Sequence, residues 1–232
     1  MVLIFMKIID FHSHILPGAD HGSDSTETSL AQIKMALDHG INTIVATPHF
    51  YPHRHSVATF IERRSKAYSE LSDAMKQAEI DIDIRLGAEV LICNGIERLP
   101  DLEKLCIAGT RVLLLELPFT DFHTSYYESV EELILNGYTV VLAHCDRYDE
   151  DIIENMISRG ALVQLNAAPL SKLIVRRTLK DWIADDIVVA LGSDIHERDT
   201  GAYRRFVKAM SKAGDHLALI MQKSEELIRS CK

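Results

Sequence analysis

This chain contains seven apolar runs of strand length, and most of them end in a histidine or a carboxylate. The first run covers residues 2–9 and leads into a D-F-H-S-H motif that contains His12 and His14, followed by a Pro17-Gly18 turn signal. A bounded apolar run of this kind is typical of a buried parallel strand. In extended backbone, residues two apart project from the same face. The two imidazoles are therefore expected to converge where the strand opens into a polar loop.

Segments with apolar residues at helical spacing separate these runs. Strands are predicted over residues 2–9, 41–47, 82–90, 111–117, 139–143, 161–165 and 187–191. Helices are predicted over residues 26–39, 58–78, 126–136, 149–159, 172–184, 203–213 and 217–230. Alternating strands and helices favour a parallel sheet with helices outside, and seven such units favour a closed or nearly closed barrel. We expect an α/β fold formed by residues 1–232 as one domain.

The overall composition excludes several classes of partner. With a formal net charge of −9, the chain carries no basic stripe suited to a nucleic-acid backbone. No stretch approaches the roughly 20 apolar residues of a membrane span. The four cysteines form no C-x-x-C pair and lie in or beside apolar runs, which indicates reduced thiols. We expect a cytoplasmic protein without nucleic acid or membrane partners, and its oligomeric state stays open.

The strand ends and the first loop offer many metal-type ligands. They are His12, His14, Asp20, His21, His49, Glu89, Glu116, His144, Asp194 and His196. In a parallel barrel the carboxyl ends of the strands share one rim, so these side chains are expected to meet there. They are too many for one ion, which implies two or three clustered metals with a carboxylate such as Glu89 as a bridge. Nitrogen and oxygen ligands without thiolates favour manganese, iron or zinc. Such clusters catalyse phosphoester or amide hydrolysis.

The order of the motifs resembles one known family. D-x-H-x-H, T-P-H, G-x-E, an internal glutamate, a strand-end histidine and S-D-x-H follow one another as in the polymerase and histidinol phosphatase (PHP) family. Within it, the opening motif, A-T-P-H-F-Y and L-E-L-P are most similar to the bacterial manganese-dependent protein-tyrosine phosphatases of capsule and exopolysaccharide synthesis. The resemblance spans nearly the whole chain. It implies a distorted (β/α)7 TIM-like barrel with two to three divalent ions, manganese first and iron or zinc as alternatives.

The resemblance also implies three ligand sets at the carboxyl ends of the strands. The first is His12, His14, Glu89 and Asp194; the second is Glu89, Glu116 and His144; the third is His49, His196 and a residue of the first loop. Relatives of this branch have D-D-G in that loop and use the second aspartate. This chain has Asp20-His21-Gly22, so the resemblance assigns the position to His21. Imidazole in place of carboxylate removes one negative charge from the third set.

Three arginines are candidates for binding substrate. Where this branch has H-P-E-R, the chain has H-C-D-R and keeps Arg147, whose guanidinium can hold two phosphate oxygens. A second phosphate-binding arginine, usual after S-D-x-H, has no match in register, although Arg198 is nearby. Arg54 lies in a polar loop that is a further candidate. Arg147, Glu89 and Asp194 are the expected catalytic residues.

These features predict a metal-dependent phosphomonoesterase. The expected substrate is phosphotyrosine in the tail of a bacterial tyrosine kinase that regulates capsular or exopolysaccharide synthesis. Two alternatives stay open: the same chemistry on a small molecule such as histidinol phosphate or a nucleotide, and a non-catalytic PHP barrel that binds metals without turnover. No cysteine begins the C-x5-R loop of cysteine phosphatases, so a thiol nucleophile is not expected.

Overall fold

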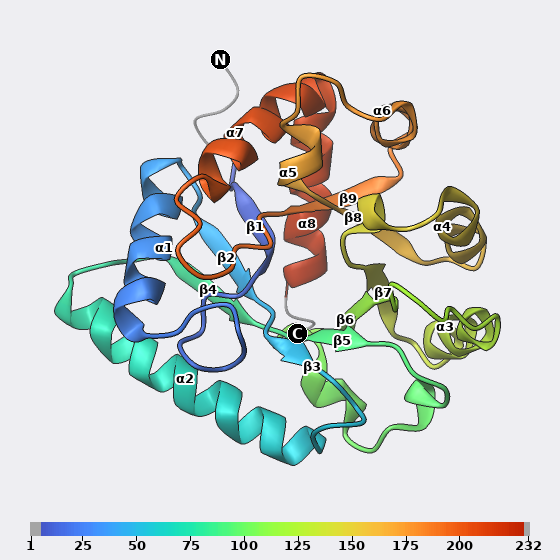
Figure 1. Cartoon of the computed structure of the whole chain (residues 1–232), viewed down its shortest axis with the longest axis horizontal. Coiled ribbons are helices and arrows are strands. Elements are labelled where there is room, and N and C mark those ends of the chain that lie inside the picture. The colour runs from blue at the N-terminus through green and yellow to red at the C-terminus, as the bar shows by residue number, and fades with distance from the viewer. Residues whose placement is uncertain (1–5, 230–232) are drawn as a thin grey trace.

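The computed structural model describes residues 6–229, in which parallel strands are surrounded by helices (Figure 1). One sheet has the order β1-β2-β4 and the other the order β3-β5-β6-β7-β8-β9. The strands are β1 Ile9–Ser13, β2 Thr43–Ala46, β3 His49–Phe50, β4 Asp83–Leu86, β5 Glu89–Leu91, β6 Val112–Glu116, β7 Thr139–Leu142, β8 Leu162–Asn166 and β9 Val188–Gly192. Every pair of neighbours is parallel, as the alternating sequence pattern predicted.

One of the seven predicted strands is broken and a second is followed by a short strand that was not predicted, which distorts the barrel. The prediction of one continuous strand over 82–90 is wrong, because β4 and β5 belong to different sheets. The neighbouring position breaks between β2 and β3, where Pro48 has no N–H to donate. Backbone hydrogen bonds still cross the breaks: Gly87 N–H donates to Ala46 O at 2.9 Å, and Glu89 N–H donates to Pro48 O at 3.1 Å. If β2 with β3 and β4 with β5 are each counted as one strand position, the nine strands occupy seven positions.

The first and last strands meet just beyond β9. Asp194 N–H donates to His12 O at 2.8 Å, and His14 N–H donates to Ile195 O at 3.2 Å. Helix α8 (Leu217–Ile228) lies across this seam, where the Ser224 hydroxyl donates to Val189 O at 2.9 Å. The arrangement is the expected α/β fold, a distorted (β/α)7 TIM-like barrel, and it brings the two ends of the strand series side by side (Figure 1).

The N-terminal strand begins later than predicted. β1 starts at Ile9, and residues 2–5 of the predicted run lie outside the described residues. Along β1, Ile9 and Phe11 are buried core residues that alternate with Asp10 and His12. His12 therefore projects from the strand itself, and His14 follows just after the strand ends.

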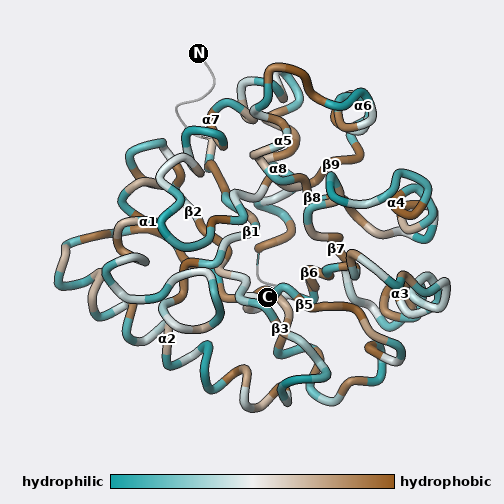
Figure 2. The backbone as a smooth tube through the Cα atoms, viewed as in Figure 1, coloured by the Kyte–Doolittle hydropathy of each residue, from teal (hydrophilic) through white to brown (hydrophobic). Residues whose placement is uncertain are grey.

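Helices cover the outside of the strands (Figure 1). They are α1 Thr26–Asp38, α2 Val57–Gln77, α3 Ser125–Leu135, α4 Glu150–Ile157, α5 Ala167–Leu170, α6 Arg177–Ala184, α7 Ala202–Ala213 and α8, with 3-10 turns η2 Ile96–Arg98, η3 Leu102–Leu105, η4 Cys145–Arg147 and η5 Gly214–His216. Hydrophobic residues are prominent in the central strands, whereas the helices mix both kinds (Figure 2). None of the described helices combines the length and apolar character needed to cross a membrane.

The predicted start of the helix over 172–184 is wrong, because residues 172–176 are not helical. α6 begins only at Arg177, because the residues that reach the core with helical spacing are Leu179, Trp182 and Ile183. The adjacent apolar residues Leu173 and Ile174 lie in the preceding loop and are exposed.

A buried arginine on α2 connects the strand breaks to the helical layer. Arg64 Nη1 donates to Gly87 O at 2.6 Å, and its Nη2 donates to Lys104 O at 3.0 Å. Gly87 is the first residue after β4, so this guanidinium supports the break that positions Glu89. Both carbonyls lose a charged donor if the side chain is shortened to an apolar one.

Replacing Arg64→Met is expected to lower the free energy of unfolding by about 2–4 kcal/mol, because buried acceptors lose their partner. Lys66→Met, an exposed change two residues away, is the control and should cost less than about 0.5 kcal/mol. Urea denaturation in the presence of a chelator measures both without a metal contribution. Equal effects of the two substitutions would contradict the role given to Arg64.

Candidate metal centre

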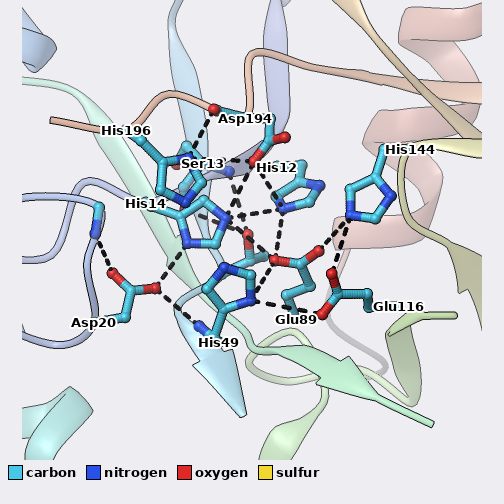
Figure 3. Close-up of polar contacts among 12 residues, drawn as sticks. His12, Ser13, His14, Asp20, His49, Glu89, Glu116, His144, Asp194 and His196 are labelled. Carbon is cyan, nitrogen blue, oxygen red and sulfur yellow. Dashed lines mark hydrogen bonds and ion pairs between the residues drawn. The ribbon is translucent and has the colours of Figure 1, made fainter. Parts of the chain in front are cut away.

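Strands β1 and β5 bring two imidazoles and a carboxylate together in the protein interior (Figure 3). His12 Nε2 and His14 Nε2 lie 3.1 Å apart, and each is 3.2 Å from Glu89 Oε2. Asp194 Oδ1 lies 3.7 Å from His12 Nε2 and 3.4 Å from His14 Nε2. Ligand atoms bound to one ion at about 2.0–2.2 Å are separated by roughly 3–3.5 Å. The first predicted ligand set therefore has the spacing of a coordination shell.

Glu89 connects this group to a second one. Its Oε1 lies 2.7 Å from His144 Nε2, while its Oε2 faces His12, His14 and His49 Nδ1, the last at 2.9 Å. Glu116 lies beside it, with Oε1 3.7 Å from His144 Nε2. Each oxygen of Glu89 thus serves a different set of donors, which is the arrangement of a bridging carboxylate. The second predicted set is brought together, and His49 joins it, with its Nδ1 3.7 Å from Glu116 Oε2.

The third set differs in part from the prediction. His14, His49 and His196 have ligand atoms within 4.8 Å of one another. The His21 ring stacks on His49 with centroids 4.8 Å apart and lies 4.8 Å from the His196 ring. Within residues 6–229, His21 belongs to none of the groups of convergent ligand atoms. Its role as a ligand stays a prediction.

The four histidines whose Nε2 atoms face the cluster have an oxygen acceptor at the other ring nitrogen. Asp20 Oδ2 lies 2.7 Å from His14 Nδ1, and Asp194 O lies 3.0 Å from His196 Nδ1. An N–H at Nδ1 leaves a lone pair on Nε2, which is the form that binds a cation. The other two histidines have the same arrangement. Gln164 Oε1 lies 3.2 Å from His12 Nδ1, and the Tyr148 hydroxyl lies 3.1 Å from His144 Nδ1.

Three of these acceptors, Gln164, Tyr148 and Asp20, were not identified from the sequence as residues that position the histidines. Gln164 also accepts from His144 N–H at 2.7 Å, and its signal was a polar side chain inside an apolar strand. The Tyr148 hydroxyl donates to Leu117 O at 2.9 Å, so its lone pairs remain for His144. Asp20, noted only as a possible ligand, accepts from the backbone N–H groups of His49 and Gly22 as well as from His14. Sequence spacing gives no signal for the contacts of Gln164 with His12 and of Asp20 with His49, which join distant segments.

Several atoms of the cluster have no hydrogen-bond partner although they are buried. They are His196 Nε2 and the facing atoms Glu89 Oε2 and His49 Nδ1, which lie 2.9 Å apart without the geometry of a hydrogen bond. Buried acceptors without a donor are costly, and a divalent ion satisfies several of them at once. Burial, followed by the negative charge of Glu89, raises the pKa of Glu116 to about 8. A bound cation removes this repulsion, so the residues present fit a metal centre.

Backbone geometry shows how closely the loops approach the cluster. His144 and Asp194 have φ values of 35° and 50°, in the left-handed region that non-glycine residues rarely adopt. At Gly22 an added Cβ would lie 2.1 Å from the Cβ of His14. At Gly192 it would lie 2.6 Å from the Cβ of His12. Only glycine permits these contacts, so both positions support the placement of the two β1 histidines.

The three arginine candidates lie at different distances from the cluster. The Arg147 side chain is 40% exposed and donates through Nη2 to Asp194 Oδ2. Arg54 is exposed, with Cζ 5.0 Å from the ring centroid of Tyr51, which stacks on His49. Arg198 lines a cavity of about 310 Å³ together with Asp20, His21, Asp24 and Glu197. Arg147 alone of the three contacts a predicted ligand within the described part of the chain.

The cysteines do not contribute to this centre. Cys145 follows His144 but is fully buried, and burial raises the pKa of its thiol well above the usual value. Its Sγ donates to Leu142 O at 3.4 Å. Cys93, Cys106 and Cys145 are free thiols, and Cys231 lies outside the described residues. A protonated, inaccessible thiol is a poor nucleophile, which agrees with the prediction that Cys145 is a packing residue.

The hydrogen bond between Tyr148 and His144 yields a direct test of the positioning network. Tyr148→Phe removes the acceptor of Nδ1–H and is expected to weaken Mn²⁺ binding about 10–100-fold, the usual effect of losing such a partner. Tyr138→Phe, the same change beside the opposite end of β7, is the control and should leave binding unchanged. Titration calorimetry on chelator-treated protein measures both. Unaltered Mn²⁺ affinity in Tyr148→Phe would show that the hydroxyl does not position His144.

Two solved structures share the fold of this chain. A crystal structure from work on YwqE of Bacillus subtilis and CpsB of Streptococcus pneumoniae, described as unique metal-dependent tyrosine phosphatases, superposes with a TM-score of 0.81 at 22% identity, covering 97% of this chain and 96% of the other. The lactonase Lmo2620 of Listeria monocytogenes superposes with a TM-score of 0.60 at 13% identity, covering 98% of this chain and 96% of the other. At these identities the likeness concerns the fold alone.

Sequence comparison identifies the family. The tyrosine-protein phosphatase YwqE of Bacillus subtilis is 30% identical over 210 residues, covering 83% of this chain and 79% of YwqE. The tyrosine-protein phosphatase CpsB of Streptococcus pneumoniae is 27% identical over 210 residues, covering 83% of this chain and 84% of CpsB. The model of the capsular polysaccharide synthesis family CpsB/CapC matches residues 8–218. The chain belongs to the CpsB/CapC family of capsular polysaccharide synthesis.

Proposed function

We propose that this protein is a metal-dependent protein-tyrosine phosphatase that holds two or three divalent ions, manganese by preference, at the centre described above. The observation that carries the proposal is the set of four histidines, His12, His14, His144 and His196, whose Nδ1 atoms each face an oxygen acceptor. The Nε2 atoms of His12, His14 and His144 lie within 3.2 Å of a Glu89 oxygen, and the His196 ring lies 4.0 Å from the His14 ring. Relatives in the same family are named tyrosine-protein phosphatases.

The ligand assignment follows the three predicted sets. Distances of 3.1–3.7 Å among His12, His14, Glu89 and Asp194 support the first, and the bridging position of Glu89 supports the second, with Glu116 and His144. His49 and His196 support the third, to which we assign His21 because its ring lies beside both. His14 also belongs to this group, because it offers a ligand atom within 4.8 Å of those of His49 and His196. Donor sets of imidazole and carboxylate suit manganese, iron and zinc.

Arg147 is the proposed phosphate-binding residue. When bound, the ions supply Lewis-acid activation of water and neutralise phosphoryl charge. Among the described residues, Arg147 uses only Nη2 on Asp194, so the donors on Nη1 and Nε remain for two phosphate oxygens. Asn166 Nδ2 donates to the same Asp194 oxygen at 2.8 Å and helps to keep that carboxylate in place. A departing tyrosine needs little protonation, since its pKa is about 10.

The proposed substrate is phosphotyrosine in the tail of a bacterial tyrosine kinase that regulates capsular or exopolysaccharide synthesis. The family description and the names of the relatives support this class of substrate. We place the reaction in the cytoplasm, a reducing compartment compatible with free Cys93, Cys106 and Cys145. Arg54 and Arg198 are proposed to contact more distant parts of the substrate, because both are exposed near the cluster.

The function is tested with a panel of phosphate esters. Protein loaded with Mn²⁺ is expected to hydrolyse a phosphotyrosine peptide in preference to a phosphoserine peptide, histidinol phosphate and a nucleotide. Chelation should abolish the activity, and added Mn²⁺ should restore it. Preference for histidinol phosphate or the nucleotide would identify a small-molecule phosphatase. No turnover of any ester by metal-loaded protein would identify a barrel that binds metals without catalysis.

The role of Arg147 is tested by two substitutions. Arg147→Ala should lower turnover of the phosphotyrosine peptide about 10²–10³-fold, the effect of losing a preorganised donor to the transition state. Metal content should be unchanged, because Asn166 still holds Asp194. Arg147→Lys should recover part of the rate, since an ammonium lacks the two-pronged geometry. Arg54→Ala should have a smaller effect, because Arg54 is proposed to contact a more distant part of the substrate. Arg177→Ala, at an exposed arginine on α6, is the control and should leave turnover unchanged. Near-normal turnover in Arg147→Ala would remove this residue from the reaction.

A further inference from the structure

Phe119 is an exposed aromatic side chain at the edge of the metal centre. It lies in the loop after β6, three residues beyond Glu116, and 63% of its surface is exposed. Its ring stacks on His144 with centroids 6.0 Å apart and an interplanar angle of 20°, and on Tyr148 at 5.8 Å and 25°. Phe119 therefore lies against a predicted ligand and the residue that positions it, while most of its ring remains accessible.

A second aromatic residue stacks on the cluster but is covered. The Tyr51 ring lies 5.2 Å from the His49 ring, with Arg54 Cζ 5.0 Å and the His53 ring 6.0 Å from its centroid. Tyr51 is only partly accessible. Among the aromatic residues of the described chain that stack on cluster histidines, Phe119 has the open surface.

The position of Phe119 relative to Arg147 suits an aryl phosphate. Arg147 Cζ lies 5.9 Å from the Phe119 ring centroid. In phosphotyrosine the ester oxygen joins the phosphorus directly to the ring, so a phosphate held by Arg147 brings the phenyl group close to Phe119. Aromatic pairs are favourable with centroids about 4.5–7 Å apart. An alkyl phosphate such as phosphoserine offers no ring for this contact.

We infer that Phe119 binds the phenyl ring of the substrate and favours aryl over alkyl phosphates, an inference that rests on the proposed phosphatase function and deepens it. The residue acts on substrate selection, whereas the metal ligands and Arg147 act on the phosphate group. Its loss should therefore raise KM for phenyl phosphate more than it lowers kcat. Metal content should stay the same, because the contacts of His144 with Glu89 and Tyr148 do not involve Phe119.

Binding of two phosphonates separates ring recognition from phosphate recognition. Phenylphosphonate and methylphosphonate carry the same acidic group, and only the first has a ring. Wild-type protein loaded with Mn²⁺ should bind phenylphosphonate more tightly. Phe119→Ala should weaken phenylphosphonate binding about three- to tenfold, the size of one aromatic pair, with methylphosphonate unchanged. Leu135→Ala, a matched loss of an exposed apolar side chain on α3, should alter neither.

A fluorescent variant gives a second readout that does not depend on turnover. The chain has one tryptophan, Trp182, which is buried on α6. Phe119→Trp adds an exposed indole, whose emission should change saturably with phenylphosphonate and much less with methylphosphonate. Equal weakening of both phosphonates in Phe119→Ala, equal wild-type affinity for the two, or no binding of either would overturn the inference. Aryl-selective binding without hydrolysis would uphold it and refute the proposed phosphatase activity.

Discussion

The centre depends on a fully buried carboxylate, Glu89, placed among imidazoles. Burial by itself opposes ionisation of Glu89, but His12, His14 and His144 hold its pKa well below the usual value. Isolated buried charges are expensive, and Glu116, Asp20 and Asp194 add further carboxylates within or beside the same cluster. Divalent cations would offset this negative charge and satisfy the buried atoms that lack partners. The residues that the barrel brings together therefore suit a metal centre.

The fold supplies these residues through irregular backbone at the ends of regular strands. The break between β4 and β5 places Glu89 at the start of a new strand, and Arg64 supports that break from α2. Left-handed backbone at His144 and Asp194 turns both side chains toward the cluster. Strain of this kind persists where the surrounding structure fixes it, here through Gln164 and Asn166. Phe119 lies outside this network, in the exposed loop after β6.

The sequence predicted the fold and the membership of the cluster because both depend on local patterns. Apolar runs separated by helical segments identify seven strand positions, and their polar ends identify residues such as His144 and Asp194. Breaks within the strand positions were missed, because periodicity does not report which sheet a strand joins. Gln164 was missed because its contact with His12 joins distant parts of the chain. Tyr148 is only four residues from His144, but the turn that brings the two side chains together has no signal in the apolar pattern. The contact of Arg147 with Asp194 spans 47 positions and has no local signal either.

We propose that the imidazoles and carboxylates around Glu89 hold several ions at once. Elemental analysis of purified protein reconstituted with Mn²⁺ tests this most directly, together with anomalous scattering from crystals of the same sample. Two to three ions per chain are expected, and Glu89→Gln should lose more than one because the carboxylate bridges two sets. Less than one ion per chain in the wild-type protein, or full occupancy in Glu89→Gln, would contradict it.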